Sequence, residues 1–139
     1  MARFVRDVMT PDPRALGKDA TAVEAARVMK EEDVGAVVIT DGDEVYGILT
    51  DRDIVVRGIA EGRSPDEIKV GDIATTELTA LQPDDSIDDA IRAVREKHIR
   101  RLPVVEDGRP VGILSIGDLA LERDQESALA EISAAAPNN

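Results

Sequence analysis

The strongest constraint on the fold of this chain is that its sequence repeats. Residues 47–49 and 112–114 both read Gly-Ile-Leu, and at this offset of 65 residues the chain matches itself without a gap from 5–53 to 70–118. Further identities along the match are Asp7/Asp72, Thr10/Thr75, Leu16/Leu81, Asp19/Asp84, Ala25/Ala90, Arg27/Arg92 and Glu31/Glu96. A gapless match of this length indicates two copies of one structural unit.

Each copy contains the pattern of an amphipathic helix. Apolar residues recur at helical spacing over residues 21–33 and 86–98, which predicts one helix in each copy. Thr21 and Ser86 precede these stretches, and each is followed three positions later by an acidic residue. This spacing is that of the capping box, which opens a helix.

A β-hairpin is expected after each of these helices. Two β-branched runs follow each helix, at 34–40 with 45–50 and at 102–105 with 111–115. Asp-Gly pairs at 41–42 and 107–108 separate the runs, and such pairs are typical of tight hairpin turns. A second helix is then expected to begin near Asp51 in the first copy and near Ile116 in the second.

The repeat also predicts the domain organisation. We assign residues 7–62 to repeat 1, 63–71 to a linker, 72–126 to repeat 2, and the Ala-rich residues 127–139 to a tail that extends a helix and then frays. One copy alone buries too little surface for a stable core. We therefore expect an α/β (α+β) fold, in which tandem β-α-β-β-α units pack with pseudo-twofold symmetry around two similar clefts.

Composition narrows the possible functions. The chain is 42% hydrophobic with a formal net charge of −12, contains no cysteine, and has Phe4 and Tyr46 as its only aromatic residues. The acidic balance argues against nucleic acid and anionic membranes as partners. The absence of cysteine excludes disulfides and cysteine metal ligands. No signal peptide or membrane-spanning stretch is recognised, so a cytoplasmic location is expected.

The motif Gly-Ile-Leu-(Thr/Ser)-x-x-Asp ends both hairpins, at 47–53 and 112–118. Its hydroxyl and acid have capping-box spacing, so the motif has a purely structural interpretation. The same groups suit a nucleotide, because a carboxylate at a helix start can accept hydrogen bonds from ribose hydroxyls. The hydroxyl side chain and the free amides of the first turn can meet phosphate oxygens. Both roles can belong to one set of residues.

These features together resemble the cystathionine β-synthase (CBS) domain pair, or Bateman module. The resemblance covers about 7–124 and rests on the Asp-Val-Met-Thr start at 7–10, the Arg-Leu-Pro-Val run at 101–104 and both Gly-Ile-Leu motifs. The sequence is also similar to small stand-alone CBS proteins of actinobacteria. The resemblance implies a non-enzymatic, energy-sensing module that binds AMP, ADP or ATP, or else NAD or S-adenosylmethionine, between the repeats. It also implies a homodimer and a regulated protein partner.

The resemblance assigns roles to particular residues of this chain. Asp53 and Asp118 would hold ribose hydroxyls, and Thr50 and Ser115 would contact ribose or phosphate. The remaining implied ligand contacts are Thr10, Pro103 and Ile113 around the adenine, and Arg100 and Arg101 at the phosphates.

The two copies differ at the implied phosphate contacts. Gly35 and Ala36 stand where the second copy has Arg100 and Arg101. We therefore expect one competent nucleotide site and one that is weaker or vacant.

Other functions have less support in the sequence. A dimeric interaction module that no longer binds a ligand remains the alternative, and apolar residues on the second helices are compatible with a dimer interface: Ile54, Val55, Ile59, Leu119 and Leu121. No catalytic residue is expected, because the only histidine, His98, has no identifiable nucleophile as partner. No metal site is expected either, since the acids at 41–44 do not continue as a calcium loop.

Overall fold

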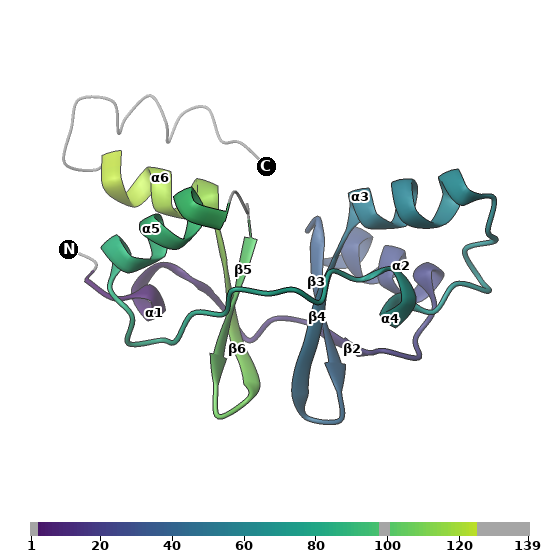
Figure 1. Cartoon of the computed structure of the whole chain (residues 1–139), viewed down its shortest axis with the longest axis horizontal. Helices are drawn as coiled ribbons and strands as arrows, with labels where there is room; N and C mark the ends of the chain where they lie inside the picture. The colour runs from purple at the N-terminus through teal and green to yellow at the C-terminus, as the bar shows by residue number, and fades with distance from the viewer. Residues whose placement is uncertain (1–2, 98–100, 125–139) are drawn as a thin grey trace. The chain divides into compact units, whose positions relative to one another are not determined.

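The chain divides into two compact units that do not coincide with the two sequence copies. The computed structural model describes residues 3–97 and 101–124 (Figure 1). Unit 1 combines Met1–Asp12 with Thr79–Asn139, and unit 2 is Pro13–Leu78. The predicted tail at 127–139 lies outside the described residues.

Unit 2 is a small sheet with helices. Its elements are β2 (Ala15–Gly17), α2 (Ala22–Glu32), β3 (Ala36–Asp41), β4 (Glu44–Thr50), α3 (Asp51–Asp53), a π-helical turn η1 (Ile54–Gly58), a 3₁₀ turn η2 (Ile59–Glu61) and α4 (Val70–Ile73). The strand order is β2-β3-β4, with β2 parallel to β3 and β3 antiparallel to β4. Thr75 extends the sheet through a bridge to Ile48 of β4.

Unit 1 has the same plan. Its elements are α1 (Val5–Val8), β1 (Thr10–Pro11), α5 (Ile87–Lys97), β5 (Arg101–Glu106), β6 (Arg109–Ser115) and α6 (Ile116–Asp124). The strand order is β1-β6-β5, with both pairings antiparallel. Leu81 adds a parallel bridge to Val104 of β5, as β2 adds a parallel strand to β3.

The opening segment of each copy is exchanged. Residues 5–11 begin the first copy but belong to unit 1, and residues 70–76 begin the second copy but belong to unit 2. Equivalent backbone bonds hold both segments: the Val5 amide donates to the Asp85 carbonyl and the Val70 amide to the Ala20 carbonyl, each at 2.8 Å. The repeat thus builds two similar sheets, each completed by the other copy.

Apolar side chains fill a separate core in each unit. The buried core of unit 1 consists of Val5, Leu81, Ile87, Ala90, Leu102, Val104, Leu114 and Leu119. The core of unit 2 includes Ile68 and Val70, both fully buried. These two residues fall within 63–71, so part of the stretch expected to be a linker contributes to the core.

The local signals explain where the elements begin. The Thr21 hydroxyl accepts a hydrogen bond from the Glu24 amide at 3.2 Å, and the Ser86 hydroxyl accepts one from the Asp89 amide at 3.0 Å. Both contacts are the N-cap interaction expected at the start of α2 and α5.

The two hairpin turns occupy equivalent positions of the repeat, although the Asp-Gly pair falls one position earlier in the first copy. The second turn is Asp107-Gly108, as predicted, and both residues have positive φ, as a type I′ turn requires. In the first hairpin Asp41 pairs with Glu44, so the turn residues are Gly42 and Asp43. The expected turn at 41–42 was therefore one residue early.

The second helices differ between the copies and correct the expected apolar surface. α6 is α-helical, whereas its counterpart passes from α3 into the π turn η1 and the 3₁₀ turn η2. Ile54 and Leu119 are buried in the cores, while Val55 and Ile59 are about half exposed. The side chain of Leu121 lies outside the described set. No described helix is long and apolar enough to cross a membrane.

A glycine in β4 makes the exchanged pairing possible in unit 2. A Cβ placed on Gly47 would lie 2.6 Å from the Thr75 carbonyl oxygen, whereas one on Gly17 of β2 would meet nothing within 4 Å. We expect Gly47→Ala to lower the free energy of unfolding by about 1–3 kcal/mol, and Gly17→Ala to have little effect. Urea unfolding measures both, and an equal effect of the two substitutions would contradict this role of Gly47.

Candidate functional site

The Ser115–Asp118 pair forms a reciprocal capping box where β6 ends and α6 begins. The Ser115 amide donates to Asp118 Oδ2 at 3.0 Å, and the Asp118 amide donates to Ser115 Oγ at 3.1 Å. Both residues are half-buried. Within the described chain the Asp118 carboxylate has no other hydrogen-bond partner than Ser115, so Oδ1 remains available to a ligand.

A row of predicted contacts crosses the sheet of unit 1. Thr10 of β1 is opposite Ile113 of β6, and Ile113 is opposite Pro103 of β5. One step along, Arg101 is opposite Ser115. Side chains alternate along a strand, so Pro103, Ile113, Arg101 and Ser115 share one face with Thr10.

The other face of this sheet packs on the core. Leu102, Val104 and Leu114 alternate with the site residues and are fully buried against α1, α5 and α6. The alternation of side chains along β5 and β6 therefore places core residues on one face of the sheet and the implied ligand contacts on the other. Arg101 supplies a half-buried cation to that second face, and it forms no ion pair with any residue in 3–97 or 101–124.

Unit 2 repeats the constellation without the cation. The Thr50 amide donates to Asp53 Oδ2 at 3.0 Å, and the Asp53 amide donates to Thr50 Oγ1 at 3.1 Å. Thr50 is opposite Ala36, which occupies the position of Arg101 in unit 1. The capping box at the helix start is thus present in both units, whereas the positive charge of Arg101 is present only in unit 1.

The structure separates the predicted site residues into two sets. Thr50 and Asp53 lie in unit 2, while unit 1 brings together six of the predicted residues: Thr10, Arg101, Pro103, Ile113, Ser115 and Asp118. Arg100 lies outside the described residues.

Sequence reasoning missed the apolar row of unit 2. There Thr75 bridges to Ile48, and Ile48 is opposite Val38. The 65-residue offset already maps these three positions onto Thr10, Ile113 and Pro103. The carbonyl of Ala74, which precedes Thr75, accepts a hydrogen bond from Arg57 Nη1 at 3.4 Å.

The first glycine of each Gly-Ile-Leu motif, Gly47 or Gly112, leaves space for the exchanged segment of its unit. A Cβ on Gly112 would collide with the Met9 side chain and lie 3.1 Å from the Thr10 carbonyl oxygen. The backbone that approaches Gly112 closely is therefore that of Thr10 in β1.

No metal centre emerges from the described residues. Among residues 3–97 and 101–124, no three His, Cys, Asp or Glu side chains are grouped as metal ligands. The whole chain has one histidine and no cysteine, the two side chains that zinc prefers alongside carboxylates.

Comparison with known proteins identifies the family. The model of the CBS domain matches residues 5–58 and 70–123, once for each copy. The chain therefore belongs to the CBS domain family and is a CBS domain pair, a regulatory module. The α+β fold expected from the repeat, and the Bateman module implied by the resemblance, are thereby confirmed.

Similar proteins occur in several bacteria. The CBS domain-containing protein YhcV of Bacillus subtilis is 38% identical over 119 residues, which cover 86% of this chain and 84% of that protein. Hypoxic response protein 1 of Mycobacterium tuberculosis is 36% identical over 116 residues, covering 83% and 81%.

Solved structures of similar proteins share the fold. Hypoxic response protein I, solved with two coordinated zinc ions, matches with a TM-score of 0.76 at 36% identity, over 84% of this chain and 96% of that one. A signal-transduction protein with CBS domains from Burkholderia ambifaria matches with a TM-score of 0.80 at 27% identity, over 89% and 96%.

The capping boxes make a measurable contribution to the fold without any ligand. We expect Ser115→Ala and Thr50→Ala each to lower the free energy of unfolding by about 1 kcal/mol, because each leaves a first-turn amide without its acceptor. Thr76→Ala is the control, since Thr76 is exposed and caps no helix. Denaturant unfolding of the three variants tests this, and a loss no larger than that of the control would contradict the capping role.

Proposed function

We propose that this CBS pair binds an adenine nucleotide at unit 1 and transmits its occupancy to a protein partner. The observation that carries the proposal is that Arg101 and Ser115 lie on one sheet face beside the row Thr10–Ile113–Pro103, with Asp118 at the start of α6 hydrogen-bonded to Ser115. No catalytic chemistry is needed for this role.

The ribose would bind at the capping box. Asp118 Oδ2 is occupied by the Ser115 amide, and Oδ1 can accept hydrogen bonds from ribose hydroxyls. A charged acceptor makes such bonds stronger than a neutral one does. Ligand and helix cap can therefore share the carboxylate without breaking the cap.

The adenine would lie along the apolar row. Ile113 is half-buried and offers apolar surface next to the exposed Thr10, while the neighbouring Pro103 is fully buried and would support the base from behind Ile113. No aromatic residue lies in this row, so the base is held by aliphatic contacts. This fits a module whose only aromatics are Phe4 and Tyr46.

The phosphates would meet Arg101, with Arg100 preceding it in the chain. Such a local pair can bind an anion although the chain as a whole has a net charge of −12, because at ordinary ionic strength distant surface charges are screened. Ala36 gives unit 2 no equivalent charge, so we propose that unit 2 binds the nucleotide more weakly.

A protein of the same fold is known with related ligands. A CBS domain pair that is 22% identical, with a TM-score of 0.79, was solved in complex with 5′-methylthioadenosine and S-adenosyl-L-methionine. Its ligands join AMP, ADP, ATP and NAD in the panel that tests the proposal.

A ligand-free interaction module is the second candidate. Val55, Val56 and Ile59 are 55%, 41% and 49% exposed on η1 and η2, and an exposed apolar group of this kind favours a protein contact. We propose that a second copy of the chain binds this surface, so that the protein forms a homodimer. Nucleotide binding and dimerisation are compatible functions, and a ligand-binding measurement distinguishes a nucleotide-binding module from an interaction module that binds no ligand.

Thermal unfolding with the ligand panel tests the proposal. A compound present at about 100 times its dissociation constant should stabilise the protein by roughly 2.7 kcal/mol and raise the midpoint. Asp118→Ala and Arg101→Ala should abolish the shift, whereas the matched variant Asp53→Ala should retain it.

Two results would count against this function. If no compound in the panel moves the midpoint of the wild-type protein, the nucleotide proposal fails and the interaction module remains. If a shift survives in both Asp118→Ala and Arg101→Ala, the ligand binds elsewhere.

A further inference from the structure

We propose that Asp7 is a positioning residue for the candidate nucleotide site, acting by fixing the segment that carries Thr10. We call residues 3–11 the docking segment. The inference rests on the proposed function, because it concerns how that site is assembled. Asp7 itself lies in α1, three positions before Thr10, and is not one of the proposed ligand contacts.

The docking segment supplies Thr10 only while it is held against the rest of unit 1. β1 is two residues long, both of them exposed, and it pairs with β6 at Ile113 and Gly112, followed by one bond from the Asp12 amide to the Val111 carbonyl at 3.3 Å. So short an edge pairing does not hold a strand by itself. Its position depends on the residues that precede it.

Those preceding residues are anchored by backbone and core contacts. The amides of Val5 and Arg6 donate to the carbonyls of Asp85 and Pro83 at 2.8 and 3.0 Å. Val5 is fully buried. These contacts have counterparts in unit 2, where Val70 is buried and Gly71 donates to the Lys18 carbonyl at 2.9 Å.

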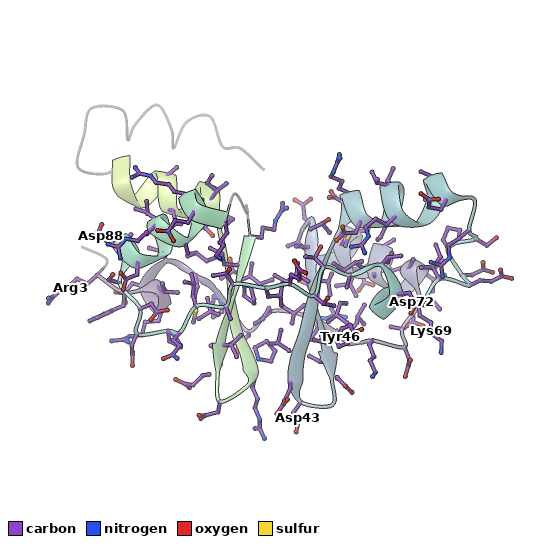
Figure 2. The ribbon with its side chains drawn as sticks, viewed as in Figure 1. Arg3, Asp43, Tyr46, Lys69, Asp72 and Asp88 are labelled. Carbon is purple, nitrogen blue, oxygen red and sulfur yellow. The ribbon has the colours of Figure 1, made fainter. Side chains whose placement is uncertain are left out.

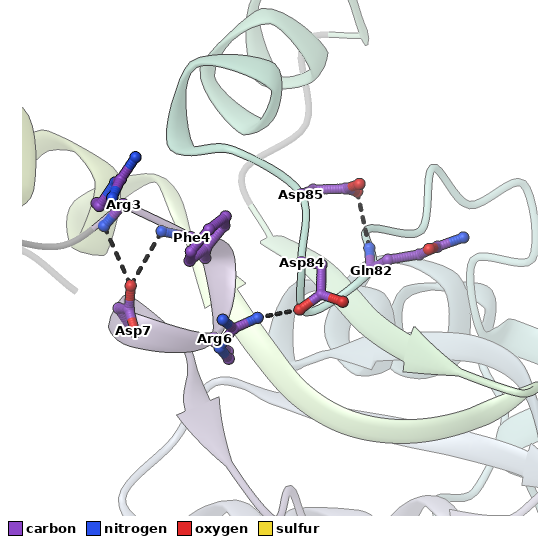
Figure 3. Close-up of polar contacts among 7 residues, drawn as sticks. All are labelled: Arg3, Phe4, Arg6, Asp7, Gln82, Asp84 and Asp85. Atoms are coloured by element: carbon purple, nitrogen blue, oxygen red, sulfur yellow. Dashed lines mark hydrogen bonds and ion pairs between the residues drawn. The ribbon is translucent and has the colours of Figure 1, made fainter.

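The hydrogen bonds of Asp7 are particular to the docking segment, whereas an ion pair at Asp84 has a counterpart in unit 2, where Lys69 lies 3.7 Å from Asp19. Asp7 Oδ2 accepts hydrogen bonds from the amides of Phe4 at 3.0 Å and Arg3 at 3.1 Å (Figure 3). Arg6 pairs with Asp84, and its guanidinium lies 4.4 Å from the centre of the Phe4 ring. Asp7 thus closes the turn at which the segment enters unit 1.

The electrostatics agree with this geometry. The amides of Phe4 and Arg3 donate to the charged carboxylate and hold the pKa of Asp7 below its ordinary value. A lowered pKa means that the ionised Asp7 stabilises the folded chain. This stabilisation is fully present above the ordinary pKa and is lost as the pH falls through the lowered one.

The equivalent residue in unit 2 has different partners and provides a matched control. Asp72 occupies the position of Asp7, and Lys69 occupies that of Phe4 (Figure 2). The Asp72 carboxylate lies 3.8 Å from Arg63 as an exposed ion pair, and exposed pairs contribute little. Among the described residues no backbone amide donates to it.

Binding and docking are thereby coupled. A nucleotide that spans Thr10, Ile113 and Pro103 contacts both the docking segment and the hairpin, so it binds best when the segment is docked. By linkage, a change that loosens the segment must weaken binding. Asp7 should therefore affect affinity without touching the ligand.

Two measurements on the full chain test the inference. Hydrogen–deuterium exchange of residues 3–12 without ligand reports docking, and titration calorimetry with the nucleotide that most stabilises the wild-type protein reports affinity. We expect Asp7→Asn to speed exchange of the segment about fivefold and to raise the Kd about fivefold, with exchange in β5 and β6 unchanged. Asp7→Glu should behave like the wild type, because a Glu carboxylate three positions after the N-cap residue can also accept a hydrogen bond from the N-cap amide. Asp72→Asn should leave segment exchange and Kd within twofold of the wild type.

The other outcomes overturn the inference and can be told apart. If wild-type protein binds none of the panel, the proposed function fails and the inference fails with it. If it binds, but Asp7→Asn speeds segment exchange and leaves the Kd unchanged, the function stands and the positioning role is wrong. If Asp7→Asn changes neither quantity, or speeds exchange throughout β5 and β6 as well, Asp7 is not a specific anchor of the segment.

Discussion

The pairing of each hairpin with a segment from the other copy is the constraint on which the rest of the structure depends. Thr10 pairs with Ile113, and Thr75 bridges to Ile48. In both pairings the backbone of the incoming segment lies where a Cβ atom of the hairpin strand would otherwise be. Gly47 and Gly112 have no Cβ atom and so leave space for it. Neither copy can therefore complete its sheet or its core alone. The duplication completes both sheets and both cores, and it also places Thr10 beside the capping box of the second copy.

The side chains of the candidate site also stabilise the fold. Asp118 and Ser115 satisfy each other's amides at the start of α6, so a nucleotide would meet a carboxylate whose position is fixed before binding. Preorganisation of this kind lowers the cost of ordering side chains on association. Unit 2 has the same preorganised box at Thr50 and Asp53 but lacks the cation. Symmetry thus supplies the framework of both sites, and the difference between Arg101 and Ala36 distinguishes them.

Much of this could be predicted from the sequence because the informative signals are local. The capping signals at Thr21 and Ser86 span only a few residues, as does the alternation of Leu102 and Leu114 with site residues. The repeat is recognised from its fixed offset. The exchange of opening segments could not be predicted, since the order of elements is the same whichever copy they pack against. The burial of Ile54 and Leu119 was missed for a related reason: exposure depends on which face of a helix meets the core. The π turn after Asp53 had no signal in the repeat.

The account's central claim is that unit 1, and not its counterpart, holds the competent nucleotide site. An amide chemical-shift titration of the labelled chain with the nucleotide that stabilises it tests this directly. The amides of Arg101, Ser115 and Asp118 should shift and saturate first, with Thr50 and Asp53 responding only at higher concentration. Saturation at Thr50 and Asp53 first, or no shift at Ser115 and Asp118, would contradict the claim.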